Sequence, residues 1–532
     1  MSRGSAFADT VCEASRCVTR ANGGNGGSGG NASTGGLGGS GEPECETNGE
    51  CIDQNFGSPY ICRDERCIPL TVPGECPVVL GAGQDLENLR KPSPIIFGAY
   101  SYVDPTAPRL SVPTLNYELA IDEINGATRG GLPGGPNGSL RPFIAVICSG
   151  TDSPDLEKSL GHLIDTLEVP AIISSLYTRD LLEAFQTKGK AANTFFLSPL
   201  EADTTLTQLE DDGLLWHMLA SARDLSPAYV PLIAQTEAYL RTERGLLPED
   251  TIKVALVDAK TPFLTDIADD LIATIEFNDK TALQNETDGN FLRVRVDSQL
   301  EVPNPDVSAA LSALEAFRPH VVLAVASSEF IGLLNNLEAT WPPAAGEKPF
   351  YLASPYLFGH PDLTNAIFSP VHGRLLGVNF AGADNTTLYD QYLSKLKSTY
   401  SVDFPLDGSE NFYDAAYFLM YSIAGAGSPP RLTGAEVALG MTRLVSGQTS
   451  FNVGTRDVSD VIGYLRGSPG ATLSLQGTMG PPNFHTGTGA RRGHPSIYCI
   501  NASREFVQNV MTFDADLGTL SGTPPCIENF SN

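Results

Sequence analysis

The stretch FIAVICSGTDSPDLEKSLGHLIDTLEVPAIISSLYTRDLLEAF (143–185) alternates short apolar runs with amphipathic segments. Its apolar runs, Phe143–Cys148 and Ala171–Ser174, are rich in Ile and Val, which is typical of strands buried on both faces. Between them, leucines recur at helical spacing after Ser153-Pro154, a cap followed by a proline at the first helical position. A strand, a crossover helix and a second strand predict a parallel sheet, so the expected fold class is α/β.

The same alternation continues along most of the chain. The other strand candidates are Ile95–Tyr100, Thr194–Leu197, Ile252–Val257, His320–Ala326 and Phe350–Ala353. Apolar residues at helical spacing predict further helices around Tyr117–Ile124, which Asn125-Gly126 ends, and around Phe412–Ile423. The strand–helix arrays over about 92–221 and 225–375 predict two doubly wound parallel-sheet lobes.

The N-terminal part of the chain differs in composition from the rest. Eleven of the twenty residues 22–41 are glycine, which leaves little side chain to bury, so we expect a disordered tether over 1–44. We expect the cysteine-rich segment 45–91 to be a small collar stapled onto the larger domain, with a recognition module as the alternative. Residues 92–532 are then the two-lobed domain.

Seven of the ten cysteines lie before residue 80, which predicts disulfides and an oxidising, exported location. Zinc is the competing interpretation, but the segment has no CxxC pair and no nearby histidine. The disulfide candidates are Cys45, Cys51, Cys62, Cys67, Cys76, Cys148, Cys499 and Cys526. The first four can pair in three ways, and we pair the remaining collar cysteine, Cys76, with Cys148. A Cys499–Cys526 bond would contribute on the order of 3–4 kcal/mol.

The net charge of −28, from 34 Lys and Arg against 62 Asp and Glu, excludes a nucleic-acid partner, because binding phosphates requires a basic patch. No 18 consecutive residues are apolar, so a spanning helix is not expected and membrane attachment would need an anchor not visible in this chain. Met1–Thr10 lacks the apolar run of a secretory leader, so either the start codon is set too far downstream or the leader is missing.

Together with NYELAIDEINGATRGGLPGG (116–135), the opening stretch resembles the Leu/Ile/Val-type periplasmic binding proteins of type I fold. Further matches, in family order, are FFLSPLEADTTLT (195–207), IKVALVDAKTPFLTDIADDL (252–271), RPHVVLAVASSEFIGLLNNL (318–337), HGRLLGVNFAG (372–382) and NFYDAAYFLMYSIAGAG (411–427). The resemblance implies two lobes joined by three crossovers, with a small-molecule ligand in the cleft. It assigns about 92–221 and 380–455 to lobe I, and about 225–378 and 456–532 to lobe II. It also implies an ABC permease or a membrane sensor as partner, and no cofactor.

Open α/β sheets bind ligands beyond the carboxyl ends of their strands, and the resemblance places the ligand against the loops there. The implied ligand-binding residues are Ser174, Ser175, Tyr177, Thr178, Ser198, Glu201, Ala202 and Asp203 of lobe I, and Phe263, Ser327, Ser328 and Glu329 of lobe II.

Two features depart from the family pattern for amino-acid binders. Its Gly-Ala-Thr-type loop is here Leu200-Glu201-Ala202-Asp203, and Phe263 lacks the hydroxyl of a tyrosine. An extra buried carboxylate beside a ligand carboxylate is unfavourable by several kcal/mol unless it is paired. We therefore expect a cationic or amine-bearing ligand if Glu201, Asp203 and Glu329 face the cleft. The alternative is that each is a solvated loop residue or a helix cap.

No nucleophile elbow, P-loop, HExxH helix or metal-spaced histidine pair occurs in the sequence, so we expect no catalytic residue and no metal site. The leading hypothesis is a periplasmic or extracellular, non-catalytic solute-binding protein that closes around a small polar molecule, an amino acid or amine-like compound, for ABC-type uptake or sensing. The alternative is a cell-surface receptor-like ectodomain or interaction module with the same fold and no transporter.

Overall fold

The computed structural model describes residues 10–13, 16–19, 43–101, 111–149, 153–247, 249–299, 302–342, 346–380, 386–402, 409–427, 429, 431–493, 495–514 and 517–530. The chain divides into two compact units, Met1–Pro43 and Glu44–Asn532. In the first unit, strands β1 (Thr10–Glu13) and β2 (Arg16–Thr19) form an antiparallel pair, which differs from the disorder expected over 1–44. The glycine-rich segment 22–41 predicted to be a tether lies outside the described residues.

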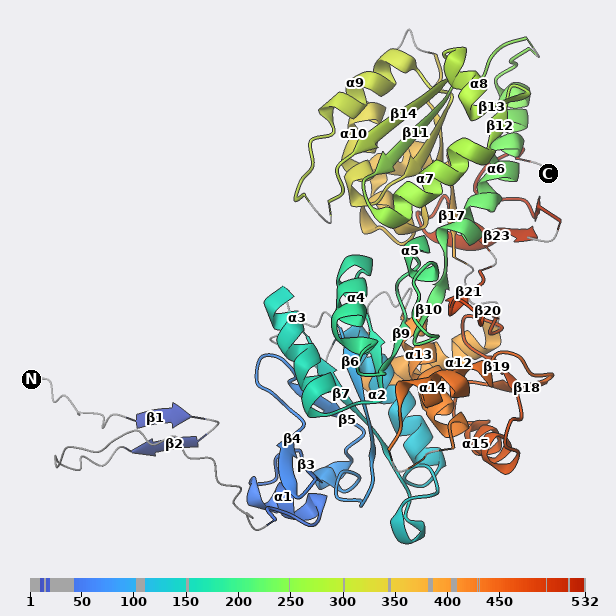
Figure 1. Cartoon of the computed structure of the whole chain (residues 1–532). Coiled ribbons are helices and arrows are strands. Elements are labelled where there is room, and N and C mark those ends of the chain that lie inside the picture. Colours follow the sequence, from blue (N-terminus) through green and yellow to red (C-terminus); the bar gives the residue numbers. More distant parts are fainter. Residues whose placement is uncertain are drawn as a thin grey trace, which may run out of the picture. The chain divides into compact units, whose positions relative to one another are not determined.

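The second unit contains two eight-stranded sheets in which parallel pairs dominate (Figure 1). The first sheet has the order β20-β21-β10-β9-β8-β6-β7-β5. Its strands are β5 (Val78–Leu80), β6 (Ile95–Tyr100), β7 (Phe143–Cys148), β8 (Ala171–Ser174), β9 (Phe195–Ser198), β10 (Leu215–Ala220), β20 (Phe484–His485) and β21 (Ala490–Arg491). Only the outermost strands, β5 and β20, pair antiparallel with their neighbours. Three of the predicted strands, β6, β7 and β8, have the predicted bounds, and β9 is shifted by one residue.

The helices of this first lobe come from two distant parts of the sequence. They are α2 (Val112–Ala127), α3 (Ser153–Leu160), α4 (Thr178–Ala184), α12 (Thr386–Tyr400), α13 (Glu410–Gly425), α14 (Gly434–Thr442) and α15 (Val458–Gly467). Single π-helical turns, Gly161–Thr166 and Phe185–Gly189, extend α3 and α4. Helix α13 is buried from Asn411 to Gly425 because α2, α14 and α15 pack around it.

The second sheet has the order β14-β11-β15-β16-β17-β22-β23-β24. Its strands are β11 (Val254–Ala259), β14 (Phe291–Val296), β15 (Val321–Val325), β16 (Phe350–Ala353), β17 (Leu375–Asn379), β22 (Ser496–Ile500), β23 (Phe506–Asp514) and β24 (Thr519–Ser521). The first five pair in parallel, and the last three are added antiparallel. The strand predicted at Ile252–Val257 begins two residues later, and β16 has the predicted bounds.

Helices of the second lobe cover this sheet. They are α6 (Ala222–Glu243), α7 (Pro262–Thr274), α8 (Ala282–Thr287), α9 (Ser308–Phe317), α10 (Ser328–Thr340) and α11 (Ser369–His372). Three 3₁₀ turns, Pro355–Leu357, Pro361–Thr364 and Ala366–Phe368, lie between β16 and α11, and the hairpin β12 (Glu276–Phe277)–β13 (Lys280–Thr281) precedes α8. A short helix, α5 (Thr204–Thr207), follows β9.

The lobe boundary near the C-terminus differs from the prediction. We expected residues from 456 onward in lobe II, but Val458, Val461 and Leu465 of α15 are buried in the core of the first lobe. Next to α15, β18 (Thr449–Asn452) and β19 (Leu473–Gln476) form a parallel pair, and β21 then joins β10. The chain therefore passes between the sheets after β10, after β17 and after β21, which gives the three crossovers expected from the resemblance.

The cysteine-rich collar shares the core of the first lobe. Its elements are α1 (Asn48–Gln54) and the hairpin β3 (Tyr60–Arg63)–β4 (Arg66–Pro69), and Ile52, Ile61 and Leu70 join the same buried cluster as the first sheet.

The disulfides are Cys45–Cys62, Cys51–Cys67, Cys76–Cys148 and Cys499–Cys526. Cys76 is thus bonded to Cys148 as expected, and it ties the collar to the end of β7. Cys45, Cys51 and Cys62 lie close together, but each is bonded in a disulfide, so the cluster offers no thiolate for zinc.

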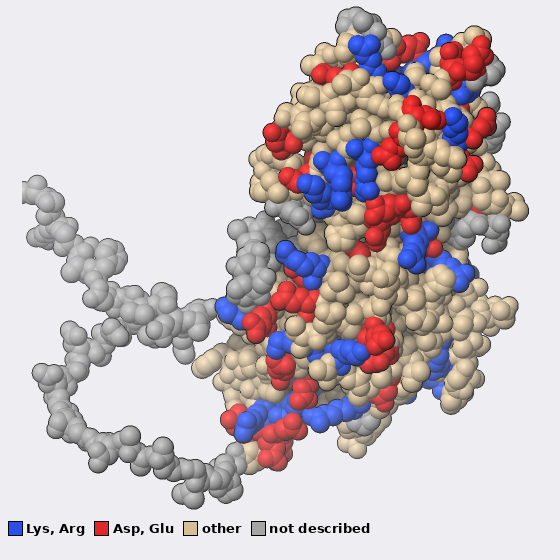
Figure 2. Space-filling view, turned by 45° about the horizontal axis from the view of Figure 1, so that its top comes forward, with Lys and Arg blue, Asp and Glu red and all other residues tan. Residues whose placement is uncertain are grey.

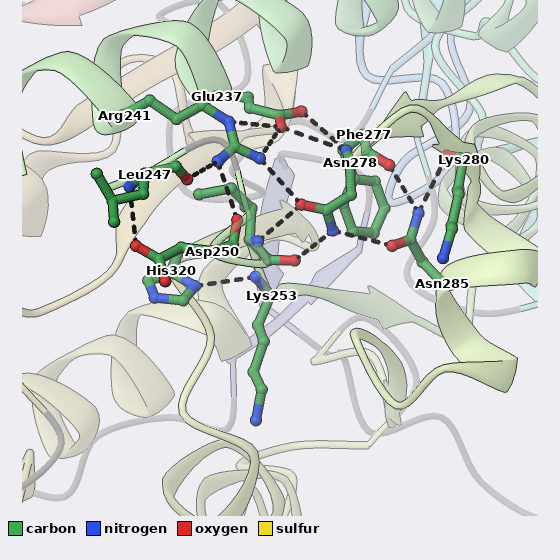
Figure 3. A network of polar contacts seen from close by, with 11 residues as sticks. Glu237, Arg241, Leu247, Asp250, Lys253, Phe277, Asn278, Lys280, Asn285 and His320 are labelled. Carbon is green, nitrogen blue, oxygen red and sulfur yellow. Dashed lines mark hydrogen bonds and ion pairs between the residues drawn. The ribbon is translucent and has the colours of Figure 1, made fainter. Parts of the chain in front are cut away.

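A polar network closes the end of the second sheet where β11 and β15 begin (Figure 3). Glu237 and Arg241, one turn apart on α6, form an ion pair of 2.7 Å, and Glu237 also accepts a bond from the Asn278 backbone at 3.1 Å. The Asn278 side chain exchanges two bonds of 2.8 Å with the Ile252 backbone. This end of the lobe is therefore fixed by paired groups.

Acidic and basic side chains are intermixed over the face shown in Figure 2. No described helix combines the length and apolar character needed to cross a membrane.

Candidate ligand-binding cleft

A cleft of about 330 Å³ lies beyond the carboxyl ends of strands from both sheets. It is lined by Tyr177, Thr178, Arg179, Asp180, Glu201 and Asp203 of the first lobe, and by Thr261, Pro262, Phe263, Leu264, Ser327 and Tyr356 of the second. These residues follow β8 and β9 in the first sheet and β11, β15 and β16 in the second. Its volume falls in the range of small-molecule sites, and its position is the one that open parallel sheets favour.

Two helices begin at the cleft, one from each lobe. Helix α4 starts after Tyr177 and carries Asp180 in its first turn. Helix α7 starts after Thr261, whose hydroxyl accepts a bond from the backbone N–H of Leu264, and Pro262 at its first position has no N–H to offer. Asp180 therefore lies at the positive end of the α4 dipole, and the Thr261 hydroxyl caps the positive end of the α7 dipole.

Glu201 is the first buried carboxylate of the cleft, with 8% of the residue exposed. The hydroxyl of Thr178 donates to its Oε2 atom, and its backbone N–H donates to the Ser198 hydroxyl at 3.1 Å. Burial, together with the neighbouring charge of Asp203, raises the pKa of Glu201 to about 7, against the effect of the Thr178 bond. The side chain is therefore poised to change its charge near neutral pH.

Asp203 is the second buried carboxylate, with 1% exposed. Its Oδ1 atom caps α5 by accepting bonds from the Thr205 backbone N–H at 2.8 Å and the Thr205 hydroxyl at 2.7 Å. Its Oδ2 atom is buried and has no hydrogen-bond partner among the described residues. Burial raises the pKa of Asp203, and the nearby Asp266 acts in the same direction. One oxygen of this carboxylate is thus structural, and the other is unsatisfied.

An aromatic wall faces these carboxylates from the second lobe. The Phe263 ring packs edge-on against Tyr356 with centroids 5.5 Å apart and stacks on Phe380 at 5.9 Å. Tyr356 is 45% exposed, and Tyr177 across the cleft is 53% exposed. Together these rings offer apolar surface to whatever enters the cleft.

The structure turns Glu329 away from the cleft, contrary to one expectation. Its carboxylate accepts bonds from the Ser327 backbone N–H at 2.7 Å, the Ser327 hydroxyl at 2.8 Å and the Gln299 backbone N–H at 3.2 Å. Ser327 itself lines the cleft, whereas the Ser328 hydroxyl contacts the His360 ring at 3.3 Å. Glu329 therefore holds the loop after β15 in place, the cap role considered from the sequence.

Four more predicted residues lie behind the cleft surface. The Ser175 hydroxyl is buried between those of Ser101 at 3.3 Å and Tyr117 at 3.4 Å, and Ser174 is fully buried at the end of β8. Ser198 is also fully buried, and Ala202 packs in the core of the second lobe. Of the twelve predicted residues, those that line the cleft are Tyr177, Thr178, Glu201, Asp203, Phe263 and Ser327.

Tyr356 is the aromatic residue that the sequence interpretation missed. It lies on the 3₁₀ turn directly after β16, a strand that was predicted with the correct bounds. The same carboxyl-end argument that selected the other loops would have selected this one. Arg179, Asp180, Thr261, Pro262 and Leu264 were likewise missed, although each is next to a predicted residue or within two positions of one.

His217 lies on β10, the strand that leads into the first crossover. It is fully buried, and its Nδ1 atom contacts the Leu219 carbonyl at 3.2 Å. Burial lowers the pKa of His217 to about 4, although the carbonyls of Leu219 and Glu201 act against this shift. A histidine that stays neutral therefore sits beside the Glu201 loop.

No family model matches the chain, and neither does any curated protein. Among solved structures, a branched-chain amino acid transporter substrate-binding protein from Streptococcus pneumoniae, in complex with isoleucine, is 11% identical, with a TM-score of 0.53 over 79% of this chain and 99% of that one. A fatty acid ABC transporter substrate-binding protein from Thermomonospora curvata is 14% identical, with a TM-score of 0.52 over 80% and 94%. An amino acid ABC transporter substrate-binding protein from Pseudomonas fluorescens is 13% identical, with a TM-score of 0.51 over 78% and 94%. The chain has the type I periplasmic-binding-protein fold of these proteins.

Proposed function

We propose that this chain is a non-catalytic solute-binding protein that takes a small molecule into the cleft between its lobes. The observation that carries the proposal is the cleft itself, in which side chains of both lobes converge on one volume of about 330 Å³ beyond the carboxyl ends of the strands. A ligand that touches both Glu201 and Phe263 would gain contacts from each lobe and would favour a closed arrangement of the two.

Two further observations support an exported protein with a partner at a membrane. Four disulfides join residues of the second unit, and such bonds persist in oxidising compartments. The solved structures with this fold that are described above are substrate-binding proteins of ABC transporters. We propose a periplasmic or extracellular location, with an ABC permease or a membrane sensor receiving the loaded form.

A thermal-shift screen tests the proposal. A ligand that binds the folded chain but not the unfolded chain raises the melting temperature progressively as its concentration increases. At 100 times the Kd, the added free energy of unfolding is about 2.7 kcal/mol. The panel should contain amines, amino acids, carboxylic acids, amides and sugars, and hits should be measured by calorimetry. If no compound in the panel stabilises the chain, solute binding is the wrong function.

A matched pair of variants tests where the hit binds. Tyr356→Ala removes an exposed ring from the cleft, and Leu283→Ala removes a side chain of similar exposure from α8. We expect Tyr356→Ala to weaken binding about tenfold, as interface aromatics do, and Leu283→Ala to leave it unchanged. Equal affinities for the two variants would place the ligand outside this cleft.

A further inference from the structure

The unsatisfied oxygen of Asp203 points to the chemistry of the ligand. A buried acceptor without a partner is unfavourable by about 1–3 kcal/mol, and by more when it is charged. Oδ1 already holds two bonds from Thr205, so the unpaired Oδ2 is not needed for the cap of α5. Asp203 also lines the cleft, with 1% of the residue exposed.

The described neighbouring groups of the first lobe do not supply the missing donor. The Thr178 hydroxyl lies near both carboxylates, but it has one proton and donates it to Glu201. Among the described residues that line the cleft, Arg179 is the one basic residue. Its guanidinium donates to Asp180 at 2.9 Å, and 84% of its side chain is exposed. Glu201 and Asp203 therefore form a pair of buried carboxylates with no counter-charge from the described residues of the lining.

The rest of the lining is suited to an apolar body rather than to a second charge. Phe263 and Tyr356 face the carboxylates with packed rings, and Tyr177 adds a third ring from the opposite side. Aromatic faces attract organic cations and pack against hydrocarbon. The starts of α4 and α7 would favour an anion, but Asp180 and the Thr261 cap already occupy those positions.

On the basis of the proposed function, we infer that the ligand is an organic cation without a carboxylate, such as a primary amine on an aromatic or branched aliphatic body. Its ammonium donates to Asp203 Oδ2 and to Glu201, and its body lies against Phe263 and Tyr356. A zwitterionic amino acid would add a carboxylate to a site that already buries two, and like-charge repulsion disfavours that arrangement. The site therefore disfavours any ligand that carries a carboxylate.

Calorimetry on the full chain at pH 8 with probes that share one skeleton tests this inference. The aromatic series is 2-phenylethylamine, phenylalanine and 3-phenylpropionate; the aliphatic series is 3-methylbutylamine, leucine and 4-methylpentanoate. Within each series the three compounds carry only an amine, both charges, or only a carboxylate. We expect at least one amine to bind tenfold or more tightly than its amino acid, and the acids to show no heat of binding.

The outcomes separate this inference from the proposed function. If an amino acid or an acid binds as tightly as the matching amine, the ligand class is wrong while solute binding stands. If none of the six binds, the inference falls, and the broader thermal-shift panel then decides the proposed function independently.

Variants test the two carboxylates directly. Glu201→Gln and Asp203→Asn keep the shape of each side chain and remove its charge, and each should weaken the amine at least tenfold. Asp211→Asn is the matched control, because Asp211 is also a buried carboxylate of the first lobe but accepts bonds from the backbone of Gly213 at 2.9 Å and Leu215 at 3.0 Å, outside the cleft lining. Circular dichroism at the temperature of the titration verifies that each variant is folded. Unchanged amine affinity in both cleft variants, or an equal loss in Asp211→Asn, would overturn the inference.

Discussion

Asp258 and Asp203 are both buried aspartates, and their surroundings are opposite. Asp258, on β11 of the second lobe, accepts two bonds from Arg293 at 2.9 and 2.8 Å and one from Arg295 at 3.1 Å. Asp203, at the cleft of the first lobe, has no cation among the described residues that touch it, and one oxygen is unpaired. The charge of Asp258 is paired with two arginines, whereas no described residue pairs with the charge of Asp203.

This difference indicates which buried charge serves the fold and which serves a ligand. Removing a carboxylate from water is unfavourable by several kcal/mol, so a carboxylate kept only for stability must be paired. Asp258 meets this condition, and so does Glu237 in the network of Figure 3. An unsatisfied carboxylate oxygen that also lines a cleft is a candidate for pairing with a ligand, because strained groups and perturbed charges cluster at functional sites.

The largest expected effect comes from neutralising the paired aspartate. Asp258→Asn leaves Arg293 and Arg295 with an uncharged partner, although their side chains are 24% and 44% exposed and Arg293 keeps its bond to Asp269 at 2.8 Å. Breaking a buried ion pair from one side destabilises a protein by about 3–5 kcal/mol. Because water screens the partly exposed arginines, we expect a loss at the lower end of that range, about 3 kcal/mol, in the free energy of unfolding measured by urea denaturation at pH 8. A loss below about 1 kcal/mol would mean that this pairing does not stabilise the lobe.

The next effect is the pH dependence of stability that Glu201 contributes. Its pKa is about 7 in the folded chain and near 4.5 when unfolded, so the folded state holds an extra proton between these values. The contribution of Glu201 to the free energy of unfolding therefore falls by about 3 kcal/mol in total as pH rises from about 4.5 to 7. The difference between the parent chain and Glu201→Gln, measured by urea denaturation at several pH values, should show this slope. A flat difference would contradict the raised pKa.

The parent profile alone would hide this slope, because His217 acts in the opposite direction. Its pKa is about 4 in the folded chain and about 6.5 when unfolded, so stability from this group is lost as pH falls through that window. Asp203, Tyr177 and Tyr356 also interact with Glu201. The comparison with Glu201→Gln is required because it cancels the contribution of His217.

The fold was most predictable at strands where burial on both faces leaves a continuous apolar run. Strands β6, β7 and β8 have such sequences, and their bounds were predicted without error. Strand β14 was missed because Arg293 and Arg295 alternate with apolar residues on this edge strand. Helix α15 was assigned to the wrong lobe because an amphipathic pattern shows that a face is buried but not which core receives it.

The loops that form the cleft were predictable from the sequence, but the directions of their side chains were not. Glu201, Asp203 and Glu329 all follow strands at their carboxyl ends, and in the structure only the first two line the cleft. Glu329 turns back onto Ser327 because two donors of that residue lie within reach of its carboxylate. Such local pairing depends on backbone geometry that a single sequence does not specify.

The smallest effect on stability is expected at the unpaired aspartate, and it is the sharpest test of the comparison. Asp203→Asn keeps an oxygen that can cap α5 through Thr205 and removes the charge that lacks a partner. In the absence of ligand, the free energy of unfolding at pH 8 should change by less than about 1 kcal/mol, or increase slightly, because the unfavourable burial of that charge is relieved. The same substitution is expected to cost several times more at Asp258, so the two variants should be unfolded in urea side by side. If Asp203→Asn destabilised the chain as much as Asp258→Asn, Asp203 would be a structural residue with a partner in the folded chain, and its unpaired oxygen would no longer indicate a site for a cation.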